Sequence, residues 1–111
     1  MKTVKDYGQW IKCVAYLLQE NNQNKEAIAL WETLDRNRPS DPMVLASLAY
    51  GYFETEEYQK AIATAEPVLA ISADPAISRT MTMLISRAHL ALGQDQEARQ
   101  WADKFKESIN G

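Results

Sequence analysis

The stretch ETEEYQKAIAT (residues 54–64) decides the fold, because two related stretches occur elsewhere in the chain. These are NNQNKEAIALW (21–31) and LGQDQEARQW (92–101). In each, a polar turn precedes an alanine, and the three alanines are 34 and 37 residues apart: Ala27, Ala61 and Ala98. Periods of roughly 20–50 residues are typical of repeat architectures. The chain is therefore expected to contain three copies of one structural unit.

Each unit is predicted to be a pair of antiparallel helices. Apolar residues on both sides of each turn recur at spacings of three and four, as at Leu45, Leu48 and Tyr52, and do not alternate. Asp-Pro connectors at 38–42 and 72–75 separate the pairs, because Pro fixes φ and Asp can cap the next helix. The predicted helices cover residues 7–19, 26–35, 43–53, 59–71, 77–92 and 97–109.

Three residues mark local irregularities. Gly93 gives the third hairpin turn a residue that tolerates positive φ. Pro75 comes two residues later in its repeat than Pro39, so we expect a longer turn between the second and third pairs. Pro67 lies inside the fourth predicted helix and is expected to kink it.

A period of 34 residues, with a small residue opening each second helix and Pro closing it, resembles the tetratricopeptide repeat (TPR). The resemblance covers residues 8–111 and implies one all-α domain spanning 1–111. Three TPR-like antiparallel helix pairs would stack as a short right-handed superhelix, with repeats at about 8–41, 42–78 and 79–111. The family's small positions fall on Ala15, Ala27, Ala49, Ala61, Ser86 and Ala98.

Composition excludes several classes of function. The 111 residues suit one domain, and a net charge of −3 is unfavourable for nucleic-acid binding. A single Cys and a single His leave no disulfide, no Cys-rich zinc site and no acid–base or metal constellation. We therefore expect no enzyme, cofactor, catalytic residue or metal site, a buried Cys13 and a structural His89. No leader or membrane span is recognisable, which favours a cytoplasmic protein.

The resemblance places the first helix of each repeat on a concave face. Several residues that point into this face are apolar or aromatic and are not needed for the packing core. Exposed apolar surface of this kind marks binding sites, and aromatic and Met side chains carry peptide binding. The alternative is that a short stack curls enough to bury some of these side chains. The predicted partner-binding groove consists of Tyr16, Met43, Tyr50, Phe53, Met83, Arg87 and Leu90.

Both ends of the stack are predicted to lack a covering helix. Trp10 lies on the first helix, and Trp101 and Phe105 lie on the last. Repeat arrays need polar-faced ends, so these residues are candidates for an open-end interface with a partner or a second copy of the chain. The alternative is that the stems of Lys104 and Lys106 cover the last helix in a monomer.

Small TPR proteins of this kind resemble the cytosolic chaperones of bacterial type III secretion, of the YscY and YscG types. The resemblance implies a protein partner, namely an amphipathic segment of a small secreted protein that the groove sequesters before export. Alternatives are a self-assembling TPR scaffold, such as a homodimer, and a general adaptor with no role in secretion. The family's carboxylate clamp is absent, because Tyr16 stands where the clamp needs Asn.

Overall fold

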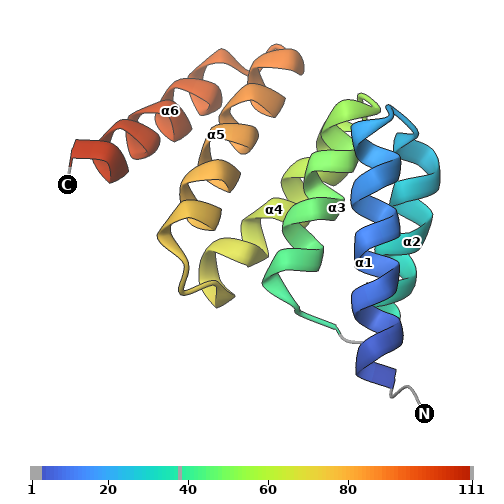
Figure 1. Ribbon diagram of the computed structural model, residues 1–111. Helices are drawn as coiled ribbons and strands as arrows, with labels where there is room; N and C mark the ends of the chain where they lie inside the picture. Colours follow the sequence, from blue (N-terminus) through green and yellow to red (C-terminus); the bar gives the residue numbers. More distant parts are fainter. Residues whose placement is uncertain (1–3, 38, 111) are drawn as a thin grey trace.

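The computed structural model describes residues 4–37 and 39–110, with side chains from Lys12 onward. Each predicted helix corresponds to one observed helix, and all ends agree within three residues. The described residues contain no strand, so the prediction of an all-α fold built from helix pairs is confirmed. The helices are α1 (Val4–Glu20), α2 (Asn24–Asn37), α3 (Pro42–Glu54), α4 (Tyr58–Ile71), α5 (Pro75–Ala91) and α6 (Asp95–Asn110) (Figure 1).

Two Asp-Pro dipeptides start the first helices of the second and third pairs. The Asp41 carboxylate accepts hydrogen bonds from the backbone N–H groups of Met43 and Val44, at 3.0 and 3.5 Å. Asp74 caps α5 in the same way, through the N–H of Ala76 at 2.9 Å. A proline follows each Asp at the first helical position, where its missing N–H costs nothing.

The three hairpin turns share one backbone motif. Asn22, Glu56 and Gly93 each have positive φ, between 62° and 77°. The residue after each of them donates its N–H to a carbonyl five residues earlier, for example Glu57 to Tyr52 at 2.8 Å. This is the Schellman end of a helix, in which Gly and Asn are favoured. The expectation for Gly93 is confirmed, and Glu56 adopts the same conformation without being Gly or Asn.

The longer spacing of the third repeat lies in a helix and not in a turn. The connector from α4 to α5 is three residues (72–74), whereas that from α2 to α3 is four (38–41). In contrast, α5 has 17 residues and α3 has 13. The predicted longer turn between the second and third pairs is therefore wrong. An added length close to one helical turn of 3.6 residues keeps the same face of α5 toward the core.

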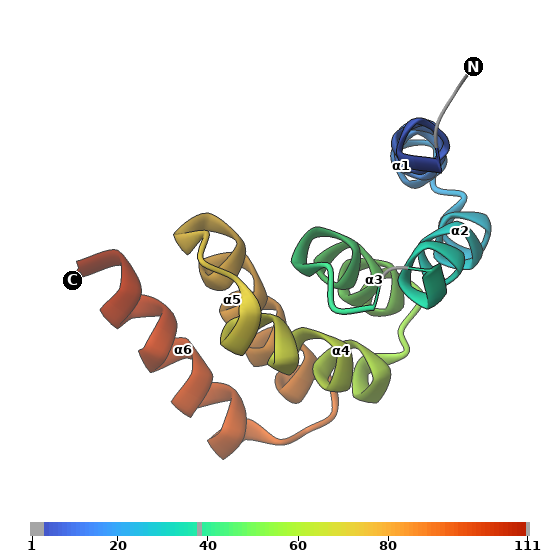
Figure 2. The ribbon, with the colours of Figure 1, turned by 90° about the horizontal axis from the view of Figure 1, so that it is seen from below.

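The six helices form two layers. Figure 2 shows α1, α3 and α5 on one side of the molecule and α2, α4 and α6 on the other. The row of pairs bends, and α1, α3 and α5 lie on its inner side (Figure 2). The whole has dimensions of 51 × 28 × 21 Å, which describes an elongated stack.

The core has one cluster at each junction between pairs. At the first junction Trp31 is fully buried, with Ala15 and Ala27, between α1, α2 and α3. At the second junction Ile85 is fully buried against Ala61 between α3, α4 and α5. These alanines have no exposed surface, because they lie where helices approach most closely.

Pro67 does not end its helix. Helix α4 continues through this residue to Ile71. Pro67 and Ala63, whose carbonyl loses its intrahelical partner, are both exposed, so water can replace the missing hydrogen bond. Within the described residues, no helix combines the length and the apolar character that crossing a membrane requires.

Candidate functional site

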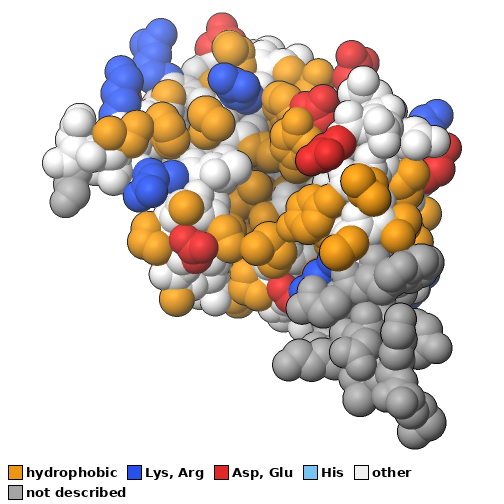
Figure 3. All heavy atoms as spheres, viewed as in Figure 1, with side chains coloured by type: hydrophobic (Ala, Val, Ile, Leu, Met, Phe, Trp, Pro, Cys, Tyr) orange, Lys and Arg blue, Asp and Glu red, His pale blue; other side chains and the backbone are white. Residues whose placement is uncertain are grey.

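The inner layer is hollowed where α1, α3 and α5 meet. The hollow, called here the inner groove, has a volume of about 460 Å³. Figure 3 shows hydrophobic side chains gathered around it on this face of the molecule. Most of the residues that line it are apolar or aromatic. The complete lining consists of Tyr16, Gln19, Glu20, Ala46, Ser47, Tyr50, Ala76, Ile77, Thr80 and Met81.

Two tyrosines form aromatic walls of the inner groove. Tyr16 on α1 and Tyr50 on α3 are 41% and 47% exposed, so each offers a large unburied ring. The Tyr16 ring meets the buried Trp31 ring edge to face, with ring centroids 5.0 Å apart. Because Trp31 has no exposed surface, this contact fixes the Tyr16 ring on a rigid support. A fixed aromatic wall loses little conformational freedom when a ligand binds.

Small residues form the floor between the walls. Ala46, Ser47 and Ala76 occupy positions where larger side chains would fill the hollow. Ser47 is 9% exposed, and its hydroxyl makes no hydrogen bond with the residues that the structure describes. The backbone carbonyl of Ser47 accepts a hydrogen bond from the Gln19 side-chain amide at 3.3 Å.

Two polar contacts connect α1 with α3. Besides the bond from Gln19, the Lys12 ammonium lies 3.6 Å from the Asp41 carboxylate. Lys12 and Gln19 are two helical turns apart and so lie on the same face of α1. These two contacts join α1 to α3 and to the N-cap residue of α3.

Two carboxylates, called here the rim, lie at the inner groove: one lines it, and the other acts on its Tyr50 wall. Glu20 lines the groove as the last residue of α1. Glu54 is the last residue of α3 and acts on the Tyr50 hydroxyl, one turn earlier. Burial first, then the charge of Glu54 and a hydrogen bond to its carboxylate, raise the pKa of Tyr50 above 10.0. Tyr50 therefore stays a neutral hydrogen-bond donor at physiological pH.

Only some of the predicted groove residues line the inner groove. Tyr16 and Tyr50 do. Phe53 is half-buried and packs on the Tyr58 ring at 5.5 Å, as part of the second junction. The remaining four predicted residues do not line it: Met43, Met83, Arg87 and Leu90. Of these, all but Met83 are exposed.

The groove runs obliquely across the inner layer. Its lining comes from the C-terminal end of α1, the middle of α3 and the N-terminal end of α5. The repeat places equivalent positions on all three helices, and equivalent positions do not indicate an oblique path. Ser47, Ala76 and Ile77 were not predicted, because a binding surface is recognised in a sequence by large side chains, whereas small or recessed side chains make this hollow.

The predicted end residues have different surroundings. Trp10 lies outside the residues whose side chains the structure describes. Trp101 is partly buried against the second-junction core, and the Lys104 ammonium lies 4.2 Å from its ring centroid. Phe105 is also partly buried. On α1, Cys13 is exposed, so the expectation of a buried thiol is wrong.

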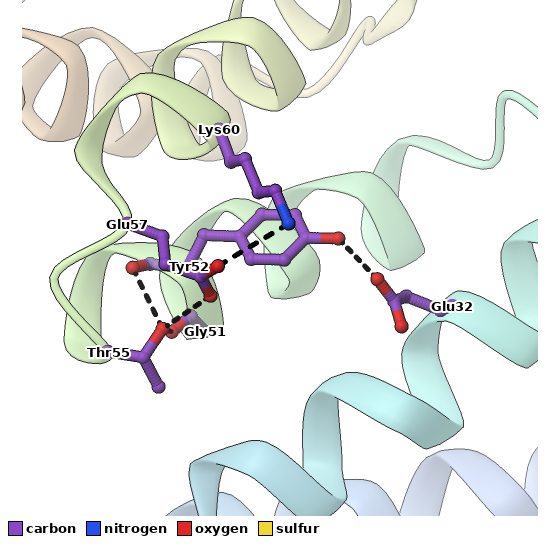
Figure 4. Close-up of polar contacts among 6 residues, drawn as sticks. All are labelled: Glu32, Gly51, Tyr52, Thr55, Glu57 and Lys60. Atoms are coloured by element: carbon purple, nitrogen blue, oxygen red, sulfur yellow. Dashed lines mark hydrogen bonds and ion pairs between the residues drawn. The ribbon is translucent and has the colours of Figure 1, made fainter.

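A polar network lies between α2, α3 and α4. The Tyr52 hydroxyl donates a hydrogen bond to Glu32 at 2.6 Å (Figure 4). The Lys60 ammonium lies 5.6 Å from the centroid of the same ring and 3.4 Å from Glu57. Burial, then the bond to Glu32 and the charges of Glu32, Glu57 and Asp35, raise the pKa of Tyr52. The network joins the first pair to the second.

His89 has a hydrogen-bond partner in the turn between α5 and α6. Its Nδ1 lies 2.6 Å from the side-chain oxygen of Gln94, so the histidine joins the end of α5 to the start of α6. Among the described residues, no group of three or more His, Cys, Asp or Glu side chains is placed to hold a metal ion.

Comparisons with known proteins give a structural neighbour. No protein-family model matches the chain, and no curated protein matches it. The chain is similar to the solved globular C-terminal domain of P. aeruginosa LpoP, with 24% sequence identity and a TM-score of 0.82. The match covers 89% of this chain and 94% of that one. At this identity the likeness concerns the fold: the same helical stack exists in another protein.

Proposed function

We propose that this chain is a protein-binding module that holds a segment of another protein in the inner groove. The observation that carries the proposal is the hollow of about 460 Å³ between α1, α3 and α5, walled by exposed tyrosines. Pockets of this size, with apolar linings and a few polar groups, are typical of binding sites. Tyrosine is among the residues that contribute most to binding energy at protein interfaces.

A narrower hypothesis concerns the biological setting. The repeats resemble those of TPR proteins, and in its small size the chain resembles the cytosolic chaperones of type III secretion. The partner would then be an aggregation-prone segment of a small secreted protein, and the chain would act in the cytoplasm without catalysing a reaction. This hypothesis rests on the resemblance of the sequence, and the fold of the structural neighbour bears only on the helical stack.

Co-expression tests the proposal. The chain is produced together with each small protein encoded beside its own gene, and any co-purifying partner is titrated against it by calorimetry. Tyr50→Ala is expected to weaken binding roughly fivefold or more, because it removes one wall of the groove. Ile109→Ala serves as the matched control, since Ile109 is 60% exposed on α6 and does not line the groove.

Two outcomes separate the general proposal from the narrower one. A partner whose affinity is the same for Tyr50→Ala and the wild type contradicts the groove as the binding site. A partner that binds in the groove but stays soluble and monomeric alone contradicts the chaperone hypothesis and leaves the binding module intact.

Self-assembly is the second candidate function, and one observation favours it. Leu17 is 58% exposed on α1, one turn from the exposed Cys13. Exposed apolar surface of this kind on α1 can pair with a copy of itself. Light scattering over a range of concentrations tests this: a constant monomer mass contradicts the scaffold, and a dimer that Leu17→Lys dissociates supports it.

A further inference from the structure

The carboxylates at the rim of the inner groove destabilise the helices that carry them. Among the described helices, only α1 and α3 end on a glutamate, Glu20 and Glu54, and neither has a basic residue in its last turn. The C-terminus of a helix carries a partial negative charge, so cations are favoured there and carboxylates are not. Two helices of the same groove thus place a carboxylate where it costs stability.

Among the described residues, no ion pair engages this rim. Lys12, the described lysine of α1, is paired with Asp41 near the other end of α3. Within the part of the chain that the structure describes, neither Glu20 nor Glu54 forms an ion pair. The rim therefore combines two carboxylates with two helix C-termini, and it favours a positively charged group of a ligand.

The lining of the groove favours a helical ligand. An extended peptide exposes backbone N–H and C=O groups that must find partners when buried. In the groove, Ala46, Ala76 and Ile77 offer no such partners, and the Gln19 side-chain amide already donates to the Ser47 carbonyl. The described chain has no strand whose edge an extended peptide can join. A helix satisfies its own backbone and presents only side chains.

We propose that the inner groove binds an amphipathic helix whose apolar face enters the hollow between Tyr16 and Tyr50, with Lys or Arg side chains meeting Glu20 and Glu54. This inference rests on the proposed function and specifies the chemistry of the partner. Ser47 adds a hydroxyl within the hollow that can accept or donate a hydrogen bond to a polar side chain of the ligand. The carboxylates select the partner, and the apolar hollow supplies most of the affinity.

Two synthetic peptides test the inference. Both form amphipathic helices of about 18 residues, or five turns, with the same apolar face, and they differ only in having Lys or Glu beside that face. Fluorescence anisotropy with the full chain is expected to show at least tenfold tighter binding of the Lys peptide. Glu20→Gln and Glu54→Gln are each expected to weaken it roughly two- to fivefold, with the Glu peptide unaffected or improved.

Control variants make the result specific. Glu107→Gln removes an exposed carboxylate on α6, outside the groove, and is expected to leave both affinities unchanged. The melting temperatures of Glu20→Gln and Glu54→Gln should equal or exceed that of the wild type, since each removes an unfavourable charge from a helix end. A variant that loses affinity through unfolding would instead show a lower melting temperature.

The outcomes distinguish the inference from the proposed function. Equal affinity for the two peptides overturns the basic helix as the partner. The same holds if the double variant Glu20→Gln and Glu54→Gln binds the Lys peptide as tightly as the wild type does. If Tyr50→Ala still weakens both peptides in that case, the groove remains a protein-binding site. If neither peptide binds, or binding ignores Tyr50→Ala, the inference and the groove as a helix-binding site both fail.

Discussion

The two junctions between helix pairs are built from different chemistry. At the first junction, where the α1–α2 pair meets α3, polar contacts flank the core around Trp31, including the bond from Gln19 and the ion pair of Lys12. At the second junction, where the α3–α4 pair meets α5, the core around Ile85 is apolar. No side-chain hydrogen bond or ion pair between described residues crosses this second junction.

This difference explains where the groove lies. Apolar surfaces gain most by closing completely, so α3 packs directly against α5. Helix α1 approaches α3 less closely than α5 does, and the side chains of Gln19 and Lys12 bridge between them. The α1 side of the inner layer stays open, and the hollow forms beside it.

The largest effect is expected at the second junction. Ala61→Leu should lower the free energy of unfolding by about 1–3 kcal/mol, because Ala61 is fully buried where helices touch. Urea denaturation measures the change. The matched control is Ala63→Leu, which places the same side chain on an exposed position of α4. Equal effects of the two substitutions would contradict the close approach at Ala61.

The first junction has a close approach of its own at Gly51. A Cβ atom there would lie 2.8 Å from Cγ1 of Ile28 on α2, so the Ile28 side chain or one of the helices must shift. Gly51→Ala should cost about 1 kcal/mol net, since overpacking exceeds the gain of roughly 0.5–1 kcal/mol from replacing glycine in a helix. In an Ile28→Ala background the same substitution should stabilise the protein. Destabilisation in both backgrounds would show that another contact is responsible.

A smaller effect is expected from the hydrogen bond between Tyr52 and Glu32. Tyr52→Phe should lower stability by about 1 kcal/mol at neutral pH. The pKa of Tyr52 is raised in the folded protein, so this contribution is present below the unfolded value of about 10 and declines as the pH rises above it. The gap between wild type and variant in urea denaturation should therefore narrow above pH 10. The variant Tyr58→Phe keeps Tyr52 and should retain the wild-type pH dependence.

The smallest effect is expected from the ion pair between Lys12 and Asp41. Its side chains are 26% and 27% exposed, so solvent screens the attraction. Lys12→Met should change the free energy of unfolding by less than about 1 kcal/mol, and the difference should shrink at high salt. Lys106→Met, on the exposed side of α6, is the control. A larger, salt-independent loss would contradict a solvent-screened ion pair, because methionine keeps an apolar stem and removes only the ammonium.

Local signals predicted the elements well and the site only in part. Helix positions follow from apolar spacing and from caps such as Asp41 and Asp74, which act within a few residues. The turn before Ala61 was predicted, but the positive φ of Glu56 was not, because glutamate has no preference for this conformation. Tyr16 and Tyr50 were predicted as groove residues and line the groove, whereas Leu90 lies beyond it.

The sequence by itself determined the repeating pairs, their boundaries and the small residues at which they touch. These properties depend on side-chain period and on turn chemistry, which are local. Only the tertiary structure decided that the groove runs obliquely from the end of α1 to the start of α5 and that Glu20 lines it. The physical reason is that the path of a groove depends on the angle between stacked pairs. That angle depends on packing and polar contacts between residues that are far apart in the chain.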